Sequence, residues 1–211
     1  MSVAMVAGAL STAFAFACAV PQAVRLLRVR RAAGVSVAAL ANSTLCGIAW
    51  MTYGAVIHDP WVVMPALVGL PVTATSLVLA WCRGGSRSQL WLPCAWFATI
   101  ATAACVAPWA GAVPITAVLG CSIALLITPA AITAWRSHDV SALVASSWML
   151  LITDAVIAGT YGCLAHVTAN LLYAAVAVAG SLVILVRLAL PAHVYGRLVH
   201  RTGRPPVPVV P

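Results

Sequence analysis

The chain contains no lysine and very little charge of either sign. Only 7% of its 211 residues are charged, three are acidic, and 64% are hydrophobic. A water-soluble domain of this length needs many more polar side chains to cover its surface, so the composition excludes that class. The missing lysine also excludes a seven-helix retinal protein, because the retinal Schiff base requires a lysine amine.

Several chemical signatures are missing as well. No Cys-x-x-Cys pair occurs among the seven cysteines, so we expect packing residues rather than a disulfide framework or a zinc site. There is no glycine-rich phosphate loop, no paired carboxylates and no nucleophile beside a base, so we expect neither an enzyme nor a cofactor. No basic residue precedes the first apolar stretch, and we therefore expect this stretch to stay in the protein as a membrane span.

Seven apolar stretches are long enough to cross a hydrocarbon core of about 30 Å as helices. The composition and these lengths predict an all-α, polytopic membrane protein with seven transmembrane helices. The predicted spans are residues 3–24, 35–57, 61–82, 90–110, 112–135, 141–164 and 167–190.

All 11 basic residues are arginine, and they fall on one side of this topology. They occupy the first, third and fifth loops and the C-terminal end, whereas the other three loops have none. Because basic residues collect at cytoplasmic span ends, we predict an external N-terminus and a cytoplasmic C-terminus. Arginine without lysine suggests a GC-rich bacterial genome, and hence the plasma membrane. The net charge of +8 then favours the lipid bilayer, and not nucleic acid, as a partner.

An internal duplication divides the apolar part of the chain. Pro21 and the pair Tyr53-Gly54 recur at Pro129 and Tyr161-Gly162, with an offset of 108 in both cases (129 − 21 and 161 − 53). Each copy holds three predicted spans, and one span is left between them. Because three is odd, that extra crossing allows the two copies to face the same way, as parallel repeats.

The duplication predicts the domain organisation. At the third helix of each copy the offset falls to 104, which aligns Pro65-Ala66 with Ala169-Asn170 (169 − 65). We expect two parallel three-helix bundles and a linker helix, an arrangement of 3+1+3, with a disordered, proline-rich and basic cytoplasmic tail. The four parts are residues 1–82 (first repeat), 83–111 (cytoplasmic loop and linker helix), 112–190 (second repeat) and 191–211 (tail).

The order of motifs in the first repeat points to a family. The motifs are Pro21-Gln22, an arginine-bearing loop, Gly34-Val35-Ser36, Trp50-x-x-Tyr53-Gly54, Asp59-Pro60 and Pro65. In this order they resemble the PQ-loop superfamily, and in particular a seven-helix bacterial member of the SWEET sugar transporters (MtN3/saliva). The resemblance covers about residues 5–190 and is weaker in the second repeat, where Pro129-Ala130 replaces the proline-glutamine pair.

The resemblance implies a substrate site that this chain has kept only in part. In the family, a tryptophan on the second helix of a repeat and an asparagine on the third line the central sugar site. Trp50 and Asn170 match these residues, whereas Ala66 and Ala158 stand at the other two positions. The resemblance therefore implies an asymmetric site, with the indole of Trp50 against C–H groups and the Asn170 amide on hydroxyls.

Asp154 is the only acid placed well inside a predicted span. A carboxylate at that depth costs several kcal/mol unless it is protonated, paired or in contact with water. No arginine lies at a comparable depth, so we expect Asp154 to face the cavity and to bind substrate or couple transport to protons. A neutral acid bonded to a neighbouring helix is the alternative.

Prolines and tyrosines at repeated positions are candidate gate and hinge residues. A proline inside a helix frees a carbonyl one turn back and permits bending, which suits helices that open and close a gate. To this group we assign Pro21, Gln22, Pro129, Tyr53 and Tyr161.

These observations predict a transporter that moves a small polar solute by facilitated diffusion with alternating access. A mono- or disaccharide is the substrate that the resemblance implies. Two alternatives stay open: a proton-coupled PQ-loop carrier of an amino acid or another metabolite, and a non-transporting scaffold or accessory protein whose site has decayed. Assembly with a second copy, as a homo-oligomer, also stays open.

Overall fold

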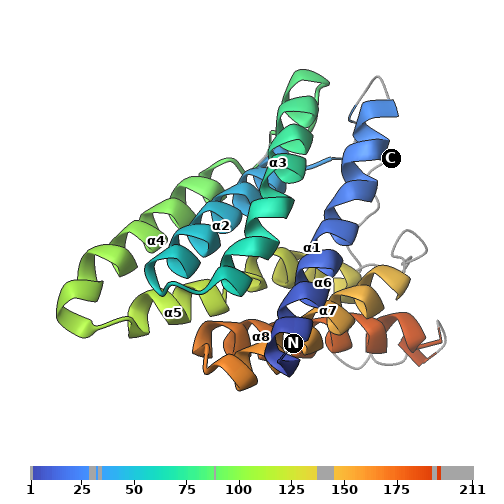
Figure 1. Cartoon of the computed structure of the whole chain (residues 1–211). Helices are drawn as coiled ribbons and strands as arrows, with labels where there is room; N and C mark the ends of the chain where they lie inside the picture. Colours follow the sequence, from blue (N-terminus) through green and yellow to red (C-terminus); the bar gives the residue numbers. More distant parts are fainter. Residues whose placement is uncertain are drawn as a thin grey trace.

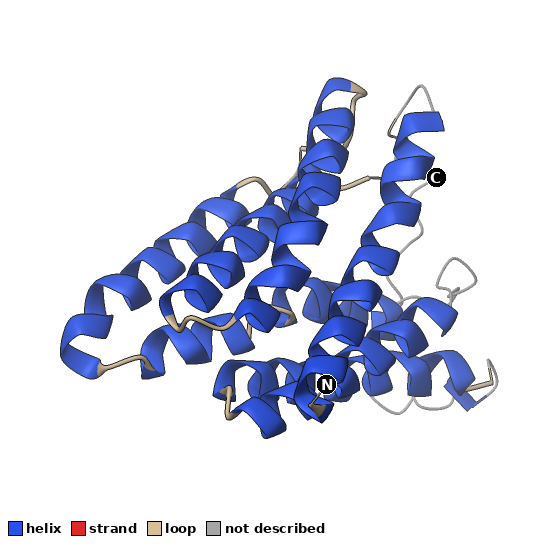
Figure 2. Ribbon diagram, viewed as in Figure 1, coloured by secondary structure: helices blue, strands red, loops and turns tan. Residues whose placement is uncertain are grey.

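A computed structural model describes residues 2–28, 32, 35–87, 89–136, 145–191 and 194–195. Within these ranges the chain consists of helices joined by loops and turns, with one isolated bridge between Ser36 and Ser86 (Figure 2). The helices of the described part are α1 (Val3–Arg28), α2 (Val37–Val56), α3 (Pro60–Cys82), α4 (Trp91–Ala110), α5 (Val113–Gly120), α6 (Ala124–Arg136), α7 (Ala145–Ala165) and α8 (Thr168–Ala189).

Five of these helices, α1, α3, α4, α7 and α8, are long and apolar enough to cross a membrane. Helix α2 has 20 residues and, at about 1.5 Å per residue, also reaches the thickness of the hydrocarbon core. The expected all-α, polytopic membrane protein is thus confirmed. Large apolar side chains such as Trp109 and Val113 are widely exposed on the helices, as a bilayer-facing surface requires.

The span expected over 112–135 differs from the prediction, because the structure divides it into α5 and α6. Between them the backbone tightens: the amide of Ser122 donates to the carbonyl of Leu119 at 3.0 Å, and that of Ala124 to the carbonyl of Cys121 at 3.0 Å. Bonds from residue i to i−3 are those of a 3₁₀ turn, which is often found within a helix at a hinge or a strained site. Span-length hydropathy cannot detect this interruption, because the turn residues are themselves small or apolar.

The packing of the helices follows the 3+1+3 division. In each repeat the third helix packs against the other two: α3 against α1 and α2, and α8 against α7 and the α5–α6 pair. The linker helix α4 packs against α2 and α5 (Figure 1). Between the repeats α1 contacts α7 and α2 contacts α5, two contacts that a two-fold rotation of the repeats would exchange. The pairs of helices that touch therefore match parallel repeats, although α1 packs extensively against α7 and α2 only touches α5.

The second helix of each repeat ends in the same local structure. His58 and His166 have positive φ angles of 55° and 58°. The next amide in each case reaches back to a glycine carbonyl at 2.9 Å, from Asp59 to Gly54 and from Val167 to Gly162. This is the Schellman arrangement that closes a helix with one residue in the left-handed region. The repeated histidines are thus explained by backbone geometry.

The repeated Tyr-Gly pairs also have a packing role. A Cβ added to Gly54 would lie 2.9 Å from the amide nitrogen of Val63, and one added to Gly162 would lie 2.8 Å from the Cβ of Asn170. Only glycine allows the second and third helices of each repeat to approach this closely.

Replacing Gly162 with alanine should therefore lower the free energy of unfolding by about 1–3 kcal/mol, because the added methyl group overpacks the α7–α8 contact. Gly69 is the matched control, since a Cβ there would meet nothing within 4 Å. Gly69→Ala should leave stability unchanged or raise it by about 0.5–1 kcal/mol. Thermal unfolding of the purified variants in detergent measures both, and equal destabilisation of the two would contradict the packing argument.

Among the described residues, the buried cluster that connects the two bundles lies at one end. Ala7 and Val62 of the first bundle pack with Tyr161, Val167 and Ala169 of the second, at the end opposite the arginine-rich loops. Toward the arginine-rich end each bundle has its own cluster, around Leu26, Val37 and Ala80 in the first and around Ile127, Ala177 and Ile184 in the second. Figure 1 shows α1 and α3 diverging from α7 and α8 toward this end. Within the described part of the chain, the helices of the two bundles are thus joined at one end and apart at the other.

Candidate substrate-binding cavity

A cavity of about 350 Å³ lies between the two bundles. This volume is within the range of small-molecule sites, about 300–1,000 Å³. Its lining comes from both repeats: α1, α2 and α3 on one side, and the α5–α6 region, α7 and α8 on the other. Trp50, Asp154 and Asn170, which the sequence nominates from three different helices, all line this one cavity.

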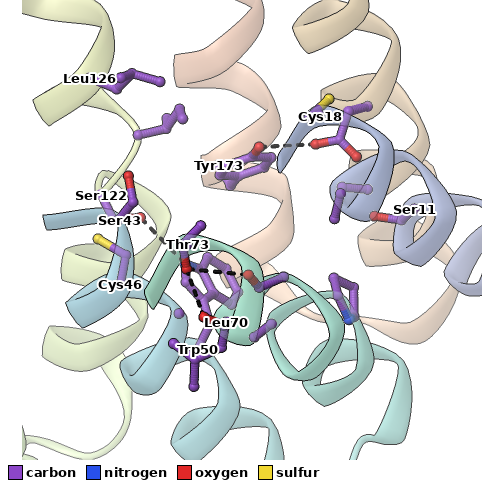
Figure 3. A pocket seen from close by; sticks show the side chains of 18 of the residues that line it. Ser11, Cys18, Ser43, Cys46, Trp50, Leu70, Thr73, Ser122, Leu126 and Tyr173 are labelled. Atoms are coloured by element: carbon purple, nitrogen blue, oxygen red, sulfur yellow. Dashed lines mark hydrogen bonds between the residues drawn. The ribbon is translucent and has the colours of Figure 1, made fainter. Parts of the chain in front are cut away.

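Trp50 and Tyr173 both line the cavity (Figure 3). The ring of Trp50 makes edge-to-face contacts with Tyr53 and Tyr173, each at a centroid distance of 6.1 Å. Its Nε1 donates a hydrogen bond of 3.3 Å to Oγ of Ser122, which lies in the tight turn between α5 and α6. Trp50 of the first bundle is therefore positioned by two side chains of the second.

Asn170 lies on α8, close to the position where the second repeat lacks a tryptophan. Its side chain is only 9% exposed, and its Nδ2 donates to the carbonyl of Ala158 at 3.5 Å. Its Oδ1 has no hydrogen-bond partner within the described part of the chain. Because Ala158 has no large side chain, the amide lies beside cavity space that a tryptophan would fill.

Asp154 lies on α7 and is 8% exposed. Its Oδ2 accepts a hydrogen bond of 3.1 Å from the hydroxyl of Tyr173, whereas its Oδ1 has no partner among the described residues. By the repeat offsets, the position equivalent to Asp154 in the first repeat is Cys46 (154 − 108), and the position equivalent to Tyr173 is Gly69 (173 − 104). At these positions the second bundle thus has a carboxyl and a phenol, whereas the first has a thiol and a glycine without a side chain.

The unsatisfied polar atoms of the cavity are all acceptors. Oδ1 of Asn42, which is 8% exposed, joins those of Asp154 and Asn170 in having no partner within the described ranges. Buried polar groups normally have hydrogen-bond partners, and a bound solute or water supplies those that the protein does not. None of the described residues that line the cavity has a basic side chain. The described lining is thus partly polar and contains no cationic group.

The two tyrosines assigned to the gates lie at the joined end of the bundles and contact the opposite bundle. Tyr161 donates from its hydroxyl to both carboxylate oxygens of Asp59, at 2.5 and 2.6 Å. Asp59 also caps α3, since its Oδ1 accepts from the amides of Trp61 and Val62. Tyr53, the equivalent of Tyr161, has only a 3.4 Å contact between its hydroxyl and that of Thr116. Of the two equivalent tyrosines, Tyr161 therefore makes the stronger hydrogen bond to the opposite bundle.

The prolines assigned as hinges lie toward the other end of the bundles. Pro21 is inside α1, and Pro129 is inside α6. The side chains of Gln22 and Pro129 lie outside the described residues, and so does almost all of the tail over 191–211, whose expected disorder stays a prediction. The backbone irregularity in the first span of the second repeat lies at Cys121–Ile123, before Pro129.

Sequence reasoning did not nominate Ser122, Tyr173 or Asp59 for the site or its closure. Ser122 and Tyr173 are adjacent to Trp50 and Asp154 only after the two bundles meet, and no spacing in the sequence reports that contact. Asp59 could have been found, because an aspartate before a proline is a helix-capping signal next to a predicted gate residue.

The long apolar helices and the central cavity define a multi-pass helical membrane protein, and its division into two three-helix repeats stays a prediction. The profile of the MtN3/saliva family, described as sugar efflux transporter for intercellular exchange, matches residues 2–83. The first three-helix unit therefore matches a SWEET-family domain, as the motifs predicted. No curated protein and no solved structure matches the chain.

Proposed function

We propose that the protein carries a small, uncharged polyol, a mono- or disaccharide, across the membrane by facilitated diffusion with alternating access. The SWEET-family domain over residues 2–83 supports sugar as the substrate class. The central observation is the cavity between the bundles, whose lining combines the ring of Trp50 with the carboxyl of Asp154 and the amides of Asn42 and Asn170; one acceptor of each polar group has no partner among the described residues. After a change of side-chain rotamer these carboxyl and amide groups can bond sugar hydroxyls, and the C–H face of a pyranose can pack on the indole.

The conformation of the bundles supports alternating access. The joined end is closed by a buried apolar cluster and by the bond from Tyr161 to Asp59, and the bundles separate toward the arginine-rich loops. With the arginines in the cytoplasm, as basic loops favour, this is the arrangement of a carrier open to the cytoplasm. A second arrangement, joined at the arginine-rich end, completes the cycle.

Uptake of labelled glucose and sucrose into liposomes that contain the purified protein tests this function. Saturable uptake should fall at least tenfold in both Trp50→Ala and Asn170→Ala, because each change removes a contact to the solute at the cavity centre. Trp109→Ala is the control, since Trp109 is 84% exposed on the linker helix α4 and is not among the residues that line the cavity. Absence of flux of either sugar, in protein that remains folded, would refute the sugar assignment.

The proton-coupled alternative is favoured by one observation, the buried carboxylate of Asp154 in the cavity wall. It predicts uptake that depends on external pH and loses this dependence in Asp154→Asn. The same liposomes at two external pH values separate it from facilitated diffusion, which should be insensitive to pH. A non-transporting scaffold predicts no saturable flux of any solute under either condition.

A further inference from the structure

Two arginines occupy equivalent positions at the arginine-rich ends of the two bundles. Arg83 follows the last residue of α3, and Arg187 lies in the last turn of α8. Their separation is 104 (187 − 83), which is the offset that aligns the third helices of the two repeats. Both repeats therefore have an arginine at this position, although many of their cavity-lining residues differ.

Each arginine binds the end of the first helix of its own bundle. Nη1 of Arg83 donates to the carbonyl of Leu26, and also lies 3.4 Å from the carbonyl of Leu27, both in the last turn of α1. The backbone adds a second connection, because the amide of Ala32 donates to the carbonyl of Arg83 at 3.0 Å. The end of α1 is thus attached to the end of α3.

The second bundle repeats this contact on the corresponding carbonyls. Nε of Arg187 donates to the carbonyl of Ala134 at 3.0 Å, and the hydroxyl of Tyr195 donates to that of Trp135 at 2.8 Å. The guanidinium of Arg187 also stacks on the ring of Tyr195 at 3.6 Å. Residues 134 and 135 are 108 positions beyond residues 26 and 27, the offset of the first helices. The same two carbonyls accept in both repeats.

These carbonyls are a favourable place for a fixed cation. The last four carbonyls of a helix have no partner within the helix, and its C-terminus carries a partial negative charge. Both contacts lie just beyond a proline: Leu26 follows Pro21 by five residues, and Ala134 follows Pro129 by five (26 − 21 and 134 − 129). A proline weakens the connection of the following turn to its own helix, so the arginine determines where that turn lies.

We propose that Arg83 and Arg187 form a pair of clasps that hold the segments after Pro21 and Pro129 against their own bundles. The clasps thereby hold these two segments apart from each other and favour the state that is open at the arginine-rich end. Closing that end requires both segments to move toward the axis between the bundles, away from the third helices. Arg83 and Arg187 are positioning residues in this role, and the inference concerns conformation alone, whatever solute the cavity carries.

The distance between the two segments tests the clasps. Val24 and Ile132 are equivalent positions (132 − 24 = 108) on these segments, and both side chains are exposed, so spin labels at them disturb little packing. Labels are placed in full-length protein whose seven native cysteines are replaced by alanine. Arg83→Ala and Arg187→Ala should each lower the ratio of long to short distances about three- to tenfold, as expected for loss of a charge-assisted hydrogen bond.

Control variants separate this role from simple loss of charge or of folding. Arg87→Ala removes an arginine that stacks on Trp81 and should leave the distances unchanged. Arg83→Lys keeps a cationic donor and should restore part of the long-distance population. If Arg187→Ala does not fold, Tyr195→Phe removes only the bond to Trp135 and should shift the distances in the same direction. Unchanged distances in folded Arg83→Ala and Tyr195→Phe, or an equal shift in Arg87→Ala, would overturn the proposal.

Discussion

Replacing Asp154 with asparagine should change the charge preference of the cavity in two opposite directions. If the proposed sugar transport holds, we expect the wild type to exclude the acid derivative of a neutral sugar and to favour its amino derivative. In Asp154→Asn the ratio of acid to neutral sugar uptake should rise at least tenfold, and the ratio of amino to neutral sugar should fall by a similar factor. The comparison of glucuronate, glucose and glucosamine in one liposome preparation measures both ratios.

The physical reason is the imbalance of charge in the cavity. One carboxylate is 8% exposed, and no described lining residue carries a compensating basic side chain. At an effective dielectric constant of about 20, a unit charge 4 Å away interacts by about 4 kcal/mol, so even a partly screened carboxylate discriminates by charge. A solute with an ammonium group receives this attraction, and an anion must overcome the same interaction as repulsion.

Tyr173→Phe is the matched control for this prediction. It removes the hydroxyl that donates to Oδ2 of Asp154 at 3.1 Å and leaves the charge in place. The order amino sugar, neutral sugar, acid should therefore persist in Tyr173→Phe. A parallel decrease in the uptake of all three sugars in Asp154→Asn would instead assign Asp154 a structural role and contradict the prediction.

The fold could be predicted from the sequence because hydropathy and duplication report on it directly. A bilayer requires long apolar helices, and the offsets of 108 and 104 fixed the correspondence of the two units before any coordinates. The turn at Cys121–Ile123 could not be predicted, because its cause is local hydrogen bonding within an apolar stretch. The close contact of Gly120 with Leu172, 2.4 Å from an added Cβ to the leucine Cβ, likewise depends on the packing of α5 on α8.

The candidate site was predictable only where one residue carries its own signal. Asp154 is a buried acid and Trp50 matches a family position, and both line the cavity. Ser122 and Tyr173 have no such signal, since serine and tyrosine are unremarkable in membrane helices until a partner from the other bundle is known. The repeat offsets give half of this information: they show that Tyr173 and Asp154 replace Gly69 and Cys46, but not that the two contact each other.

The second large effect is expected at the joined end of the bundles. Tyr161→Phe should reduce the population closed at that end about tenfold, because it removes a hydrogen bond to a carboxylate. Val56 and Leu164 are equivalent, exposed positions there (164 − 56 = 108) that can carry spin labels. Their distance should lengthen in Tyr161→Phe. In Tyr53→Phe the closed population should change less than twofold, because the Tyr53 hydroxyl makes only a 3.4 Å contact with Thr116.

Asp59→Asn refines this prediction, because asparagine can still cap α3 and accept from Tyr161 without a charge. We expect an intermediate shift at the joined end, with α3 intact. An unchanged distance between Val56 and Leu164 in Tyr161→Phe would show that the apolar cluster around Ala7 and Val62 closes this end without the bond.

The bond from Tyr161 to Asp59 and the arginine clasps lie at opposite ends of the molecule, yet both favour the same state. Closing one end and opening the other are one equilibrium if the bundles move as rigid units, and independent contributions to one equilibrium add as free energies. The fold-changes of Tyr161→Phe and Arg83→Ala should therefore multiply in the double variant, at both label pairs. The two ends would open independently if, in the double variant, the pair at the joined end shifted only as in Tyr161→Phe and the pair at the arginine-rich end only as in Arg83→Ala.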